Sequence, residues 1–207
     1  MRYIYLHGFA SGAQSRKARA FHAGLARAGH ELEIPDLARG DFEHLTIGGQ
    51  LGVIEDTLAG EPARLIGSSM GGYLAALYAS THPEVDRLVL LAPAFAFAER
   101  WEELTGPDKL RAWRETGGLE VYHYGANAMS RVHYGLFEDA RRHPANPDFH
   151  QPALIFHGLH DETVPIGLSR TFAATHPNAA LTEMDSGHEL LNVLDDIVAA
   201  AVPFPGE

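Results

Sequence analysis

The chain has 207 residues, a formal net charge of −11 at pH 7 and no cysteine. This length suits one domain, and it allows a sizeable core without disulfides or zinc–thiolate sites. The acidic balance, without any basic run, argues against nucleic acid as a partner. No stretch approaches the roughly 20 apolar residues of a membrane span. No signal peptide is recognisable either, so we expect a cytoplasmic protein.

Short apolar runs alternate with helical patterns along the chain. The apolar runs predict strands at about 2–7, 31–37, 63–67, 85–93, 152–158 and 179–185. Helices are predicted from Ser15 to Gly29, around 51–58, over 70–80 and from Leu190 onward. This order predicts βαβ units, and therefore a doubly wound α/β fold with a mostly parallel sheet of about six strands.

The segment at about 96–149 interrupts this rhythm. It holds both tryptophans, Trp101 and Trp113, and shows no convincing strand. We interpret it as a mostly helical insertion in a single domain spanning 1–207. We expect it to lie over one edge of the sheet, above the carboxyl ends of the strands, as a cap. Phe95, Phe97 and Trp101 are candidates for lining an apolar substrate pocket, although aromatic residues at helical spacing are more often core.

Residues 65–73 read "LIGSSMGGY" and contain the pattern G-x-S-x-G with Ser69 at its centre. The pattern follows a buried-type strand and opens a helix, which is the setting of a nucleophile elbow. Gly67 and Gly71 suit the close backbone approach that such a turn requires. A plain Gly/Ser turn or a phosphate-binding loop is the alternative, and the strand–helix context favours the elbow. Ser68 occupies the variable position.

A nucleophilic serine needs a histidine base and a carboxylate that orients it. In an open parallel sheet these groups must follow strands, because sites lie beyond the carboxyl ends. His188 follows the last strand in "DSGHEL", and Asp161 follows the fifth strand in "FHGLHDETVP". Glu162 and Asp185 are the competing carboxylates.

Acyl transfer also needs donors for the oxyanion. The loop "LHGFASG" after the first strand can supply the backbone N–H of Phe9, and the elbow can supply that of Met70. We expect His7 to brace this loop rather than act as the base. His157 and His160 could suggest a metal site with Asp161, but their spacing does not place them on one helix face.

Four segments together resemble the α/β-hydrolase superfamily, and most closely small bacterial esterases of the YqiA type and related acyl-thioesterases. The segments are "YLHGFASG", "LIGSSMGGYLAALYA", "HGLHDETVP" and "SGH", with Ser15, Lys17 and Ala18 matching the family at the first helix. The resemblance implies Ser69 as nucleophile, Asp161 as acid and His188 as base. The superfamily usually has two strands before "YLHGF", so a trimmed sheet is expected.

These observations predict a serine hydrolase that cleaves carboxylic esters of small or medium acyl chains through an acyl-enzyme. A thioesterase or small amide hydrolase would use the same triad. A non-catalytic binding protein on this scaffold is disfavoured by the intact set of three residues. No cofactor or metal is expected, and the partner is a small-molecule ester or thioester. The sequence does not indicate an oligomeric state.

Overall fold

The computed structural model describes residues 1–204 and contains the predicted six-stranded sheet. All six strands are parallel and lie in the order β2-β1-β3-β4-β7-β8. Their bounds are β1 (Arg2–Leu6), β2 (Leu32–Glu33), β3 (Ala63–Ser68), β4 (Val85–Leu91), β7 (Ala153–Gly158) and β8 (Ala179–Met184). The α/β fold class and the number of strands predicted from the sequence are confirmed.

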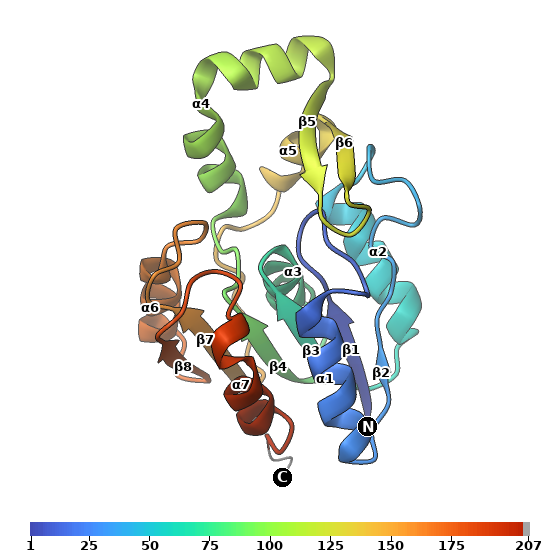
Figure 1. Ribbon diagram of the computed structural model, residues 1–207, viewed down its shortest axis with the longest axis vertical. Coiled ribbons are helices and arrows are strands. Elements are labelled where there is room, and N and C mark those ends of the chain that lie inside the picture. The colour runs from blue at the N-terminus through green and yellow to red at the C-terminus, as the bar shows by residue number, and fades with distance from the viewer. Residues whose placement is uncertain (205–207) are drawn as a thin grey trace.

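Helices cover both faces of the sheet (Figure 1). They are α1 (Arg16–Arg27), α2 (Ile47–Leu58), α3 (Met70–Ala79), α6 (Ile166–Thr175) and α7 (Leu194–Ala201), with a short 3₁₀ turn, η1 (Leu191–Val193). In β1 the side chains alternate: Tyr3 and Tyr5 pack with α1 and α7, while Ile4 and Leu6 pack with α2 and α3. The sheet is therefore buried on both faces, as its continuous apolar runs predict. Within residues 1–204, none of the helices has the length and apolar character to cross a membrane.

The second strand is much shorter than the predicted 31–37. Only Leu32 and Glu33 pair with β1. Pro35 has no N–H for the ladder, and the Asp36 side chain accepts hydrogen bonds from the N–H groups of Ala38 and Gly40. The chain therefore turns away from the sheet two residues after β2.

The insertion contains a β-hairpin as well as helices, which corrects the expectation of a segment without strands. Its elements are α4 (Phe97–Thr116), β5 (Gly118–His123), β6 (Ala128–His133) and α5 (Gly135–Ala140), with β5 and β6 antiparallel. The hairpin is hard to recognise because exposed positions also carry apolar side chains, as at Tyr122 and Met129. Gly106 kinks α4 with a φ of 74° just before Pro107.

The insertion is tied to the main domain at several backbone positions. Figure 1 shows α4, the hairpin and α5 on the side of the sheet where the strands end. The N–H of Gly125 in the hairpin turn donates to the Ala10 carbonyl at 3.2 Å, and the N–H of His133 donates to the Glu43 carbonyl at 2.7 Å. Asp139 accepts a further hydrogen bond, from the Gly48 N–H at 2.7 Å. The insertion therefore contacts the loops that follow β1 and β2.

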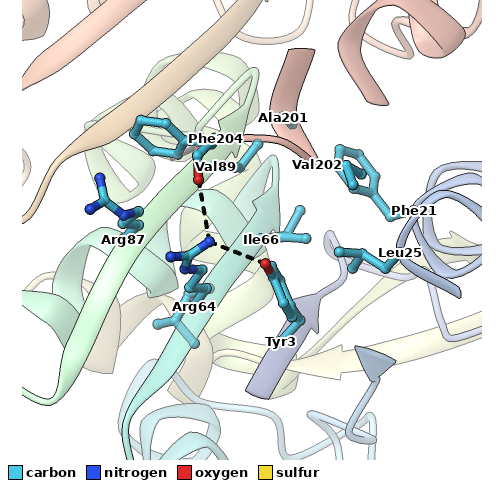
Figure 2. Close-up of a pocket in the computed structure, with 11 residues that line it drawn as sticks. Tyr3, Phe21, Leu25, Arg64, Ile66, Arg87, Val89, Ala201, Val202 and Phe204 are labelled. Carbon is cyan, nitrogen blue, oxygen red and sulfur yellow. Dashed lines mark hydrogen bonds between the residues drawn. The ribbon is translucent and has the colours of Figure 1, made fainter. Parts of the chain in front are cut away.

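A small pocket lies at the opposite, amino-terminal end of the strands (Figure 2). It is bounded by α1, the end of α7 and residues of β1, β3 and β4. The Arg64 guanidinium donates to the Tyr3 hydroxyl at 3.1 Å and to the Phe204 carbonyl at 3.2 Å, and it also binds Asp86. These contacts fasten the end of the described chain to the sheet. Ser69 is not among the residues that line this pocket.

Two glycines in helix interiors offer a matched test of this packing. A Cβ at Gly24 in α1 would lie 2.4 Å from a methyl carbon of Val198 in α7, whereas a Cβ at Gly52 in α2 would meet nothing within 4 Å. Val198 is stiff because it is β-branched in a helix. We therefore expect Gly24→Ala to destabilise the fold by about 1–3 kcal/mol, through overpacking. Gly52→Ala should stabilise it by about 0.5–1 kcal/mol. Thermal denaturation measures both, and equal stabilisation by the two variants would contradict this packing.

Candidate active site

Ser69 lies in the turn between β3 and α3 with an unfavourable backbone conformation. Its φ is 54° and its ψ is −118°. Such a conformation costs about 1–3 kcal/mol and persists only where the surroundings enforce it. A Cβ at Gly67 would lie 2.3 Å from the Gly71 carbonyl oxygen, and one at Gly71 would lie 2.0 Å from the Leu6 carbonyl oxygen. The glycines of the pattern are therefore required by close backbone contacts on both sides of Ser69.

The structure brings the three predicted residues Ser69, His188 and Asp161 into one chain of hydrogen bonds. His188 Nε2 lies 3.1 Å from Ser69 Oγ, and His188 Nδ1 lies 2.7 Å from Asp161 Oδ2. The carboxylate can only accept, so Nδ1 carries the proton and Nε2 is left with a lone pair facing the serine hydroxyl. This arrangement can remove a proton from Ser69.

Asp161 is fixed on all sides. Its Oδ1 accepts from the N–H groups of Thr163 and Val164 at 2.9 and 2.8 Å. Its Oδ2 faces both His188 and, at 3.2 Å, Nε2 of His157. Burial on its own would raise the pKa of Asp161, but the hydrogen bonds from His157, His188 and the Val164 N–H outweigh burial and hold that pKa below its usual range. The carboxylate is therefore anionic at neutral pH.

The loop after β1 lies directly against the elbow. A Cβ at Gly8 would lie 3.3 Å from the Ser68 carbonyl oxygen and 3.4 Å from Ser69 Cβ. Phe9 follows in this loop, and Met70 opens α3. Within residues 1–204, no protein group accepts a hydrogen bond from the backbone N–H of either Phe9 or Met70. Neither N–H is therefore engaged by the protein itself.

Ser68 belongs to a different environment from Ser69. It is 3% exposed. Burial raises the pKa of the nearby Tyr5 phenol strongly, and the Ser68 and Ser15 hydroxyls oppose that rise only in part, so the phenol stays neutral. Tyr5 packs on the α1 face of the sheet. The Ser68 side chain is therefore engaged in the core rather than at the site.

The start of α1 lies next to the segment that carries His188. Ser15 caps α1 by accepting from the Ala18 N–H at 3.2 Å. Lys17 is buried, and its Nζ lies 3.7 Å from a carboxylate oxygen of Glu189. Burial lowers the pKa of Lys17, and Glu189 partly opposes that effect. The ion pair joins α1 to the residue after His188.

The other candidate residues from the sequence lie outside the hydrogen-bonded set of Ser69, His188 and Asp161. Asp185 accepts from His160 Nε2 at 2.9 Å in an exposed pair, and Glu162 is exposed. His7 is buried, which lowers its pKa, and its Nδ1 donates to the Gly8 carbonyl at 3.0 Å within the loop after β1. Among residues 1–204, no three histidine, aspartate or glutamate side chains are grouped so that they could hold a metal ion.

The three aromatic candidates for a substrate pocket differ in burial. Phe95 is completely buried, with its ring stacked on Phe172 at a centroid distance of 4.2 Å. Phe97 is 5% exposed and stacks on Tyr73. Trp101 is partly buried, and its ring meets that of Phe9 edge-on at 5.2 Å. Trp101 is therefore the one of the three that contacts the loop carrying the predicted oxyanion donor.

The parallel sheet, the strained elbow and the order Ser, Asp, His along the sequence define an α/β-hydrolase fold. The sequence matches the family described as "Uncharacterised protein family (UPF0227)" over residues 2–204, and the chain belongs to that family. The resemblance to the α/β-hydrolase superfamily and its YqiA-like esterases is confirmed at this level. No curated protein matches the chain.

Solved structures with this fold cover nearly the whole chain. Est1E from Butyrivibrio proteoclasticus, with ferulic acid bound, has a TM-score of 0.82 at 21% identity, covering 98% of this chain and 87% of its own. Alpha/beta hydrolase domain-containing protein 10 from mouse has a TM-score of 0.80 at 20% identity, covering 96% and 87%. A monoacylglycerol lipase from Paleococcus ferrophilus has a TM-score of 0.68 at 18% identity, covering 97% and 95%. At these identities the likeness establishes the fold alone.

Proposed function

We propose that the protein is a serine hydrolase that cleaves carboxylic esters of small or medium acyl chains. The observation that carries this proposal is the continuous chain from Ser69 Oγ through His188 to Asp161 at a strained elbow. The esterase and lipase among the structural neighbours support the same reaction class. A thioester or amide would meet the same groups, and only the leaving group would differ.

In the first half-reaction Ser69 Oγ attacks the acyl carbon while its proton passes to His188 Nε2. The carbonyl π electrons move to the oxygen, which the N–H groups of Phe9 and Met70 stabilise as an oxyanion. When the tetrahedral intermediate collapses, the bond to the alcohol oxygen breaks, and the alcohol leaves with the proton from His188. Asp161 keeps His188 in the required tautomer and stabilises its cation.

In the second half-reaction a water molecule takes the place of the alcohol. His188 accepts the proton of the water as its oxygen attacks the acyl-enzyme, and the same N–H groups stabilise the second oxyanion. Collapse releases the carboxylic acid and returns the proton to Ser69 Oγ. The cycle needs no group outside the protein and the substrate.

The insertion acts in this proposal as a cap that shapes the acyl pocket. Two contacts support this role: Trp101 of α4 meets the Phe9 ring, and the Gly125 N–H of the hairpin turn binds the Ala10 carbonyl. Both contacts are to the loop that supplies the Phe9 donor. A side chain of the insertion can therefore reach substrate held at Ser69.

Replacement of Ser69 distinguishes a nucleophilic serine from a serine that is only a turn residue. We expect Ser69→Ala to lower kcat for p-nitrophenyl acetate by on the order of 10⁶-fold. Ser68→Ala is the matched control, and it should retain activity within about tenfold because Ser68 is buried and His188 faces the Ser69 hydroxyl instead. Loss of activity in Ser68→Ala with full activity in Ser69→Ala would refute the assignment.

A change at Trp101 tests the cap. We expect Trp101→Gln to shift the acyl-length preference in a series of p-nitrophenyl esters, by roughly tenfold in relative kcat/KM per affected methylene. Leu104→Gln is the control, because Leu104 lies in the same helix but is 60% exposed. A flat length profile together with a lowered melting temperature in Trp101→Gln would show that Trp101 is core and that the pocket lies elsewhere.

A further inference from the structure

A second histidine, His157, contacts the same carboxylate oxygen as His188. His157 is the fifth residue of β7 and is completely buried. Its Nε2 lies 2.8 Å from the Val164 carbonyl and 3.2 Å from Asp161 Oδ2. Its Nδ1 lies 2.7 Å from the hydroxyl oxygen of Ser169, a completely buried residue of α6. The reaction described above makes no use of either side chain.

These contacts determine where the protons lie. The Val164 carbonyl and the Asp161 carboxylate can only accept, so His157 Nε2 must carry a hydrogen and share it between them. The Ser169 hydroxyl can then donate to Nδ1, so a neutral ring satisfies all its partners in a site with no access to water. His157 therefore has one tautomer and one orientation, both imposed by neighbours.

The result is a symmetric network centred on Asp161. On one side Ser69 donates to His188, which donates to Asp161; on the other side Ser169 donates to His157, which donates to the same oxygen. We propose that His157, held by Ser169, is a positioning residue that fixes Asp161 Oδ2 and limits the negative charge it presents to His188. This role rests on the proposed function of the Ser69 site.

The other charged groups around His157 are already paired. Glu183 of β8 lies in register with His157, but its carboxylate accepts two hydrogen bonds from Arg170 at 2.7 Å. Asp185, the residue that follows β8, pairs with His160. A change at His157 therefore acts on the carboxylate of Asp161, and through that carboxylate on His188.

The test measures pH–rate profiles of His157→Phe and His157→Gln with p-nitrophenyl acetate. Phe keeps the ring but removes the donor, which leaves more charge on Asp161 Oδ2 and a stronger hold on the His188 cation. Because Asp161 Oδ2 also loses a contact that holds it in place, we expect kcat to fall about 10- to 100-fold with KM little changed. The stronger hold on the His188 cation should move the acid limb of the profile to higher pH. Gln carries an amide nitrogen at the same number of bonds from the backbone, and it should move the acid limb back toward that of the wild type.

His176→Phe is the control, because His176 stacks on Phe172 of the same helix α6 without contact to Asp161. It should affect stability without moving the acid limb of the pH–rate profile.

If His157→Phe does not fold, Ser169→Ala provides the test instead. For this variant we expect a smaller fall in kcat, with the acid limb displaced in the same direction. An unchanged kcat and acid limb in the folded His157→Phe, or in Ser169→Ala, would overturn the role of His157. A wild-type protein without Ser69-dependent hydrolysis would instead refute the proposed function, and this role with it.

Discussion

The backbone conformation of Ser69 is the constraint on which the site depends. A φ of 54° for a residue with a Cβ is unfavourable, and here it projects the hydroxyl beyond the end of β3 toward His188. The conformation is enforced by neighbours that admit no side chain, since the Leu6 and Gly71 carbonyls occupy the space that a Cβ at Gly71 or Gly67 would need. The fully buried helix α3 and the central strand β3 supply the rigidity that holds this turn.

The parallel sheet brings the other residues of the site close to Ser69. Because all six strands run in one direction, the loops after β1, β3, β7 and β8 emerge at the same edge, and each contributes one part of the site. The loop after β1 carries Phe9, the loop after β7 carries Asp161, and that after β8 carries His188. The insertion after β4 then contacts the first of these loops through Gly125 and Trp101.

The sequence was sufficient to predict the sheet and to select Ser69, Asp161 and His188, because both follow from local patterns. Buried parallel strands read as apolar runs, and only residues just after such strands can converge. It was not sufficient for the β5–β6 hairpin, because exposed positions such as Tyr122 and Met129 carry apolar side chains there. The hairpin is held to α4 by a tertiary contact, the hydrogen bond from the Trp113 indole N–H to the Val132 carbonyl. The short β2 follows from Pro35, a signal that could have been used.

Side-chain environments were the least predictable part. The sequence suggests His157 only as a possible metal ligand, yet it donates to Asp161 from inside the core. No spacing rule reveals a contact that depends on how α6 packs on β7. Phe95 and Trp101 have similar sequence surroundings, but one is stacked on Phe172 and the other reaches Phe9. Burial and exposure of an aromatic residue are decided by tertiary packing, which periodicity alone does not encode.

In the proposed function, the geometry at the elbow activates Ser69 as a nucleophile and no other hydroxyl group of the chain. The most direct measurement is mass spectrometry of the intact protein after treatment with a fluorophosphonate, followed by peptide mapping of the adduct. We expect one adduct per chain, located on Ser69, and none in the His188→Ala protein under the same conditions. An adduct on Ser68 or on another serine, or none in the wild-type protein, would contradict it.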